Sequence, residues 1–141
     1  MARQEIDIRK TTEAEPAAIW RLLGDGSTWP WWTPIESFDL ERPAGTDGLG
    51  EVRAFKTGRV RVREEIVEYR AERRLSYKLL SGLAVRDYRA DIDLTPRRGG
   101  TEIHWHTTFT AKMPGTGWLY RAALTKATQR FVDGLAEHSA G

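Results

Sequence analysis

Five runs of alternating apolar and polar residues follow one another through the middle of the chain, separated only by short connections. The runs cover about 50–57, 59–70, 74–80, 87–95 and 101–111, and the connections are Gly58, RAERR, SGLAVR and PRRGG. Alternation of this kind is typical of half-buried strands. Parallel neighbours need crossover connections of a dozen or more residues, so connections this short predict an antiparallel meander.

The segments on either side of this meander complete a two-layer fold. In RQEIDIRKT, Ile6 and Ile8 share one face of a predicted first strand, and ESFDLE predicts another short strand. After MPGTG (residues 113–117) apolar residues recur at three- and four-residue steps, which predicts a helix of about twenty residues with one apolar stripe. The buried face of a sheet and the apolar stripe of a helix cover each other. We therefore predict an α+β fold in which a seven-stranded antiparallel sheet curves around a long C-terminal helix.

Two short helices are predicted between the first and second strands. Pro16 suits a first helical turn and apolar residues follow it, until two glycines end the helix. The tryptophan segment, Ser27–Pro34 (STWPWWTP), holds at most one further turn. Because an indole buries a large apolar area, we predict that Trp20, Trp29 and Trp32 close the open end of the sheet. The alternatives are that one of them also lines a cavity mouth, or that they form an exposed recognition patch.

The composition fits a single domain over residues 1–141 and excludes several function classes. No cysteine is present, which rules out disulfides, thiol catalysis and thiolate-bound metals. Lys and Arg total 22 against 20 Asp and Glu, a net charge of +2, so general attraction to nucleic acid is weak. No apolar run approaches the roughly 18 residues that span a bilayer, and the N-terminus has no apolar signal core. We predict a cytoplasmic protein, monomeric or homodimeric, with no nucleic-acid partner, no stable membrane insertion and no cofactor.

Alternation also predicts which side chains of each strand face the helix. In strand 59–70, Val60 and Val62 share a face with Glu64, while arginines occupy the other face, so the valines carry Glu64 inward. The alternative is a bulge near Glu64 and its neighbour that reverses the facing, since apolar Val67 and Tyr69 lie on the charged face.

The inner face is mostly apolar with a few polar groups, which suits a cavity for a small apolar ligand. The alternative is a filled core whose polar groups satisfy one another. The ligand-binding residues that we expect are Trp32, Arg53, Val62, Glu64, Ile66, Tyr77, Leu79, Leu83, Tyr88, Ala90, Trp105, Thr107, Phe109, Tyr120, Leu124 and Phe131.

Glu64 is the strongest candidate for chemistry in the chain. A carboxyl on an apolar wall has a raised pKa, as a general acid or base near neutral pH requires. With Tyr77 and Tyr88 it could polarise a carbonyl and move a proton, as aldol cyclisation and dehydration need. The alternatives are an ion pair with Arg53 on the neighbouring strand and a polar anchor for a ligand.

The outer face offers two weaker patterns. Glu102, His104 and His106 alternate along one strand face, but ligands about 7 Å apart fit a single zinc ion poorly, so no metal site is predicted. Arg61 and Arg63 belong to a basic stripe that Glu65, Asp91, Asp93 or Glu102 could neutralise, which predicts a solvated charged face.

Three stretches together resemble the polyketide cyclase/dehydrase branch of the START-related, birch-pollen-allergen-like superfamily. They are AEPAAIWRLLGDGSTWPWWTP, REEIVEYRAERRLSYKLLSGLAVRDYRADIDLTP and GGTEIHWHTTF. The resemblance implies a helix-grip fold with a cavity between sheet and helix, in a superfamily that binds or processes polyketides, lipids, sterols and plant hormones. Ser81-Gly82-Leu83 also resembles the gate loop of the hormone receptors, although Ala84 stands where they carry proline.

Three functions follow as hypotheses. The first is a carrier, sensor or sequestering protein for a hydrophobic or aromatic small molecule. The second is a polyketide cyclase, aromatase or dehydratase that uses Glu64 as acid/base with Tyr77 and Tyr88. The third is a protein-interaction module that uses the outer face of the sheet.

Overall fold

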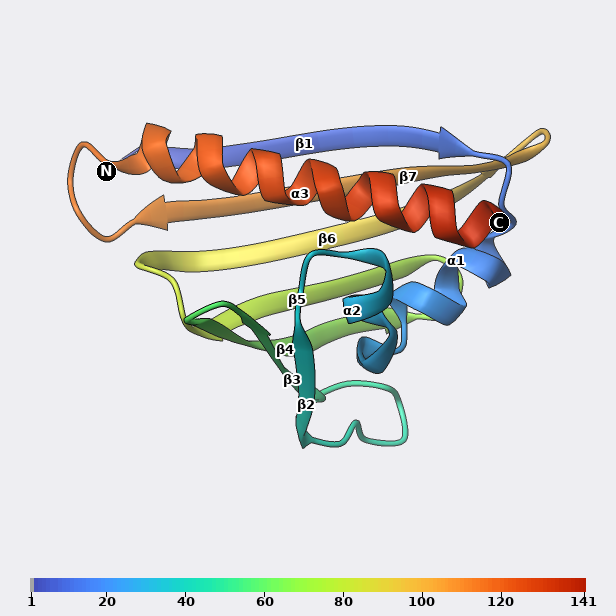
Figure 1. The fold of residues 1–141 in the computed structure, drawn as a ribbon, viewed down its shortest axis with the longest axis horizontal. Coiled ribbons are helices and arrows are strands. Elements are labelled where there is room, and N and C mark those ends of the chain that lie inside the picture. Colours follow the sequence, from blue (N-terminus) through green and yellow to red (C-terminus); the bar gives the residue numbers. More distant parts are fainter. Residues whose placement is uncertain (1) are drawn as a thin grey trace.

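The computed structural model describes residues 2–141 as one curved sheet with a long helix across it (Figure 1). The elements in chain order are β1 (Arg3–Thr12), α1 (Pro16–Leu23), the 3₁₀ turn η1 (Gly26–Thr28), α2 (Trp29–Trp32), β2 (Ser37–Arg42), β3 (Val52–Thr57), β4 (Val60–Arg70), β5 (Arg74–Ser81), β6 (Val85–Arg97), β7 (Gly100–Ala111) and α3 (Gly117–Ala140).

The sheet is antiparallel throughout, with strand order β1-β7-β6-β5-β4-β3-β2. Six strands form the meander, and β1 joins it by pairing with β7 from the far end of the chain. In Figure 1, α3 crosses the sheet along β1 and β7, with its C-terminus beside α1. The helix-grip fold predicted from the sequence is confirmed, with seven strands and two short helices between the first and second.

A bulge in β4 explains the apolar residues that break its alternation. The register with β5 shifts between Ile66 and Glu68, so the strand gains one residue and reverses its facing there. Tyr69 therefore pairs with Leu75 and packs its ring against Trp20, with centroids 5.1 Å apart. Because this shift follows Ile66, Glu64 keeps the inward facing that the valines predicted.

The tryptophan segment plugs one end of the sheet, as predicted. Trp29 and Trp32 are 1% and 3% exposed, with ring centroids 4.9 Å apart. The Trp29 ring also stacks on Phe55 at 4.9 Å and meets Phe131 of α3 at 6.1 Å. Of the three tryptophans in this segment, Trp31 alone is exposed, at 67%. We name this part of the molecule, where α1, α2 and the C-terminal half of α3 meet, the closed end.

The C-terminal half of α3 is fixed more firmly than its N-terminal half. Its fully buried residues all lie from Thr128 onward. A Cβ on Gly134 would sit 1.9 Å from the carbonyl oxygen of Trp32, so only glycine lets α3 approach α2 this closely. Lys10 of β1 binds Asp133 at 2.8 Å, and the Thr12 hydroxyl donates to the Ala136 carbonyl at 3.1 Å.

Candidate functional site

A cavity of about 140 Å³ lies between the sheet and the middle of α3. Sheet strands supply one wall, α3 supplies the other, and the β5–β6 loop borders it. The wall is apolar apart from a few polar side chains. It is lined by Trp29, Ile35, Phe55, Thr57, Val60, Val62, Glu64, Tyr77, Leu83, Tyr88, Leu124, Ala127, Thr128 and Phe131.

Glu64 carries the one carboxyl group among the lining residues, and no cation in the described part of the chain contacts it. It is 8% exposed, and within residues 2–141 no hydrogen bond or ion pair engages its carboxyl group. Burial raises the pKa of Glu64 to about 8, and the charge of Arg53 opposes this rise. At neutral pH most of the carboxyl is therefore protonated, and it is able to donate a hydrogen bond as well as accept one.

Arg53 faces Glu64 across the β3–β4 ladder, but its guanidinium is bound elsewhere. It donates to the carbonyls of Leu23 and Gly24 at 3.2 and 2.6 Å and pairs with Glu51. It also lies over the Trp29 ring, 5.9 Å from the centroid. The alternative of a Glu64–Arg53 ion pair is therefore wrong, because the carbonyl groups at the end of α1 hold the guanidinium at the closed end.

Two stacked phenols on the neighbouring strands β5 and β6 share the sheet wall of the cavity with the carboxyl. The rings of Tyr77 and Tyr88 have centroids 6.4 Å apart, and Phe109 extends the stack from Tyr88 at 6.1 Å. Burial raises the pKa of both hydroxyl groups, and the proximity of Glu64 adds to the rise. Both phenols therefore stay protonated and offer hydrogen-bond donors, not bases.

The expected ligand-binding residues divide into two groups in the structure. Seven of them border the cavity: Val62, Glu64, Tyr77, Leu83, Tyr88, Leu124 and Phe131. The others surround it without reaching its surface, because the sheet, α3 and the tryptophan segment pack directly on one another there: Trp32, Arg53, Ile66, Leu79, Ala90, Trp105, Thr107, Phe109 and Tyr120. The Thr107 hydroxyl in this packed layer is buried and has no hydrogen-bond partner among residues 2–141.

Several lining residues were not on the expected list. Trp29 corresponds to the alternative in which one tryptophan also lines the cavity. Phe55 follows Arg53 by two positions in β3, and the period-two alternation could have identified it. Ala127 belongs to the apolar stripe that predicts the helix, but the polar Thr128 gives little signal in such a stripe.

The outer face of the sheet is charged and paired. Arg61 and Arg63 both bind Glu41 of β2, at 2.9 Å, so the expected neutralising carboxylates are wrong for these two arginines. His106 comes together with Glu5 and Asp7 of β1, with one potential ligand atom from each within 4.8 Å of the others. All three are solvent-accessible, and no second observation points to an ion there.

The fold and the cavity together define a helix-grip protein. The chain matches the family described as polyketide cyclase/dehydrase and lipid transport over residues 3–140, and it belongs to that family. Family and fold indicate a protein that binds hydrophobic ligands. No curated protein matches the chain. None of the helices within residues 2–141 combines the length and apolar character needed to cross a membrane.

Solved structures share the fold at low sequence identity. A START superfamily protein from Mycobacterium smegmatis is 12% identical, with a TM-score of 0.82 and 96% of each chain covered. A protein from Thermobifida fusca is 23% identical, with a TM-score of 0.81 over 96% of this chain and 92% of that one. Norcoclaurine synthase from Thalictrum flavum, solved with dopamine and hydroxybenzaldehyde, is 16% identical, with a TM-score of 0.74 over 96% and 86%. At these identities the likeness establishes the fold alone.

Proposed function

We propose that the protein binds a hydrophobic, aromatic small molecule that carries a hydrogen-bond acceptor such as a ketone or quinone carbonyl. The observation behind this is the convergence of one buried carboxyl and two phenols on an otherwise apolar cavity. At neutral pH all three groups offer donors: Glu64, Tyr77 and Tyr88. An acceptor on the ligand would pair with them, while its rings would contact Trp29 and Phe131.

The size of the cavity sets a condition on this proposal. A cavity of about 150 Å³ holds a molecule the size of benzene, and drug-sized ligands need roughly 300 Å³ or more. A ligand with several rings therefore requires the N-terminal half of α3 or the Leu83 loop to move outward. The distribution of contacts favours such a movement, because the bonds that tie α3 to β1 come from its C-terminal half.

We place a carrier, sensor or sequestering role before catalysis. Only one ionisable group on the cavity wall has a pKa near neutrality, and both phenols hold their protons too tightly to act as bases. A proton transfer that needs a separate acid and base would lack the second group.

A thermal-shift screen against aromatic polyketides, flavonoids, fatty acids and sterols tests the proposal. A compound that binds only the folded state at about 100 times its Kd adds about 2.7 kcal/mol and raises Tm by several degrees. Ala127→Phe should abolish the shift by filling the cavity, whereas Ala122→Phe on the exposed side of α3 should retain it. The proposal would be contradicted if no compound raised Tm, or if both variants lost the rise in Tm to the same extent.

The second candidate is a cyclase or dehydratase in which Glu64 transfers the proton. The raised pKa of Glu64 favours it, since an acid with a pKa of about 8 both gives and takes protons near neutral pH. Any compound that binds should then be turned over, with kcat reduced at least about a hundredfold by Glu64→Gln. Full turnover by Glu64→Gln, with ligand binding retained, would remove Glu64 from that role.

A further inference from the structure

Three connections meet at the end of the sheet opposite the tryptophan plug. The β7–α3 loop reaches the β5–β6 loop through a hydrogen bond from the Lys112 amide to the Ala84 carbonyl at 3.1 Å. The β5–β6 loop lies directly on β4, since a Cβ on Gly82 would stand 2.3 Å from the Arg61 carbonyl oxygen. We define the mouth end as residues 2–4, 57–60, 80–86 and 110–126, which gather at the left of Figure 1. The cavity reaches this end through Thr57, Val60 and Leu83.

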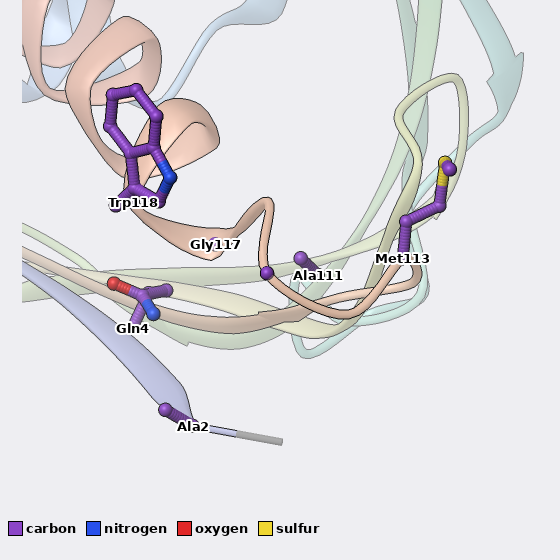
Figure 2. Close-up of a pocket in the computed structure, with 7 residues that line it drawn as sticks. Ala2, Gln4, Ala111, Met113, Gly117 and Trp118 are labelled. Carbon is purple, nitrogen blue, oxygen red and sulfur yellow. The ribbon is translucent and has the colours of Figure 1, made fainter.

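Exposed apolar side chains concentrate at the mouth end. Eight large hydrophobic residues are exposed among residues 2–141, and five belong to this end. Figure 2 shows Trp118 and Met113 projecting on either side of the loop at Gly117, beside a surface hollow of about 240 Å³. The five and their exposed fractions are Val60 (48%), Leu80 (39%), Met113 (64%), Trp118 (65%) and Leu119 (55%).

The charge at this end has one sign. The four segments contain no Asp or Glu, and they carry the cations Arg3, Arg59, Arg86, Lys112, Arg121 and Lys126. Within residues 2–141 none of these six forms an ion pair within 4.0 Å. Three carboxylates border the segments. Glu36 accepts a hydrogen bond from the Gly58 amide at 2.6 Å, Asp87 follows Arg86 in β6, and Glu5 follows Gln4 in β1, where it lies 3.3 Å from His106.

This combination fits one kind of partner. Tryptophan prefers the interface between lipid headgroups and hydrocarbon, where its ring is buried and its N–H stays hydrated. Leucine and methionine side chains enter the acyl region, and free cations around them attract anionic headgroups. The apolar residues lie at the start of α3, on the turn before it and at the ends of β4 and β5, so they form a projecting tip and not a groove for a peptide. We propose that the mouth end docks reversibly on anionic lipid bilayers and presents the cavity entrance to the membrane.

Docking of this kind is peripheral, and it is distinct from the stable membrane insertion that the sequence argues against. It also does not depend on the identity of the cavity ligand. The two proposals are separable, because ligand binding is measured without vesicles and docking is measured without ligand.

The test is co-sedimentation of the purified full chain with lipid vesicles at low salt. We expect binding to vesicles of equal parts phosphatidylcholine and phosphatidylglycerol, and little to phosphatidylcholine alone. Each cation near an anionic surface changes affinity by about fivefold, so Lys112→Gln with Arg121→Gln should weaken binding at least tenfold. The matched pair Arg73→Gln with Arg98→Gln, from turns at the other end of the sheet, should leave binding unchanged.

The two exposed tryptophans provide the sharpest control. Trp118 is 65% exposed and Trp31 is 67% exposed, and Trp31 lies beside His138 near the other end of α3. These ends are about 30 Å apart along the helix at 1.5 Å per residue. Trp118→Ala should reduce vesicle binding severalfold, and Trp31→Ala should not.

Each alternative outcome counts against the proposal. Equal binding to both vesicle types would show that the cations play no role in docking. An equal loss of vesicle binding in Trp118→Ala and Trp31→Ala would show that the mouth end is not the docking surface. A third outcome is that the wild-type chain binds neither vesicle type but forms dimers, and that Trp118→Ala dissociates them. The mouth end would then be a contact surface for a second copy of the chain, and the membrane proposal would be wrong. Circular dichroism on every variant separates loss of docking from loss of fold.

Discussion

The closed end and the mouth end of the sheet differ in how their side chains are used. At the closed end Trp29, Trp32 and Arg53 are almost fully buried, and the last turns of α3 rest on the backbone of α2. At the mouth end the first three turns of α3 have no fully buried residue, and Trp118 stands in solvent. The same residue type therefore stabilises the fold at one end and forms an accessible surface at the other. The buried contacts of α3 lie at one end of the helix, and its exposed apolar surface lies at the other.

Among the variants that compare the two ends, Trp29→Ala should lower the free energy of unfolding the most. Its ring contacts Phe55, Trp105 and Phe131, so truncation opens a cavity where three elements meet. We expect the free energy of unfolding to fall by about 3–5 kcal/mol in urea denaturation. Trp31→Ala in the same segment should change it by less than about 0.5 kcal/mol. Similar values for the two variants would show that the plug is not a stabilising unit.

Arg53→Met should cause the next largest loss in the free energy of unfolding. Methionine keeps most of the side-chain length but leaves the carbonyls of Leu23 and Gly24 without their donor, at a cost of about 3 kcal/mol in free energy of unfolding. Arg61→Met, on the next strand, removes an exposed ion pair with Glu41 and should cost under about 1 kcal/mol. Urea denaturation of both variants measures the contrast, and equal losses would contradict the structural role of Arg53.

The pH dependence of stability tests the cavity itself. In the unfolded chain Glu64 ionises near its ordinary pKa of 4.5, whereas in the folded chain it stays protonated up to about pH 8. Between pH 5 and 7 the folded state therefore keeps a proton that the unfolded state has mostly lost, and the free energy of unfolding falls by about 2 kcal/mol as the pH rises. Above pH 8 both states are ionised and the loss levels off.

The comparison variant for this prediction is Glu64→Gln, which cannot ionise. In Glu64→Gln the free energy of unfolding should lack the fall between pH 5 and pH 8 that is due to Glu64. Glu65→Gln, which changes the outward-facing neighbour, should keep that fall. The measurement is urea denaturation at pH 5, 6, 7 and 8 for the three proteins. Parallel slopes for wild type and Glu64→Gln would mean that the carboxyl group is not buried in a raised-pKa environment.

Trp118→Ala should have the smallest effect on stability. Because its side chain is 65% exposed, its removal should change the free energy of unfolding by less than about 0.5 kcal/mol. The same denaturation experiment measures it. A loss above about 1 kcal/mol would show that the mouth end is packed in solution, and the contrast between the two ends would then fail.

The architecture could be predicted from the sequence because its signals are local. Short connections impose an antiparallel meander, and valine alternation fixes the inward face of β4. The alternative of a bulge near Glu64 lies close to two register shifts between β4 and β5, one between Arg63 and Glu64 and one between Ile66 and Glu68. Only the second adds a residue to β4 and reverses its facing, and the sequence marks it only by apolar Val67 and Tyr69 on the charged face.

The extent of the candidate site could not be read in the same way. Alternation identifies every inward residue of a strand, but it does not say where α3 lies closely on the sheet and where a gap remains. Trp105 faces inward as expected, yet Trp29 and Phe131 of α3 cover it. The direction of the Arg53 side chain was equally inaccessible, because its partners are backbone carbonyls at the end of α1.

The pairing of β1 with β7 has a consequence for the order in which the chain assembles. Thr12 pairs with Thr101 and Arg3 with Thr110, so the first strand of the sheet pairs only after the last one has been synthesised. The meander from β2 to β7 closes through short loops, whereas this ladder and the attachment of α3 to β1 join the two ends of the sequence. Contacts of such wide separation form slowly, since the loop must close before they contribute. On the ribosome, β1 therefore remains an unpaired strand until most of the polypeptide has emerged, and the grip on α3 is completed last.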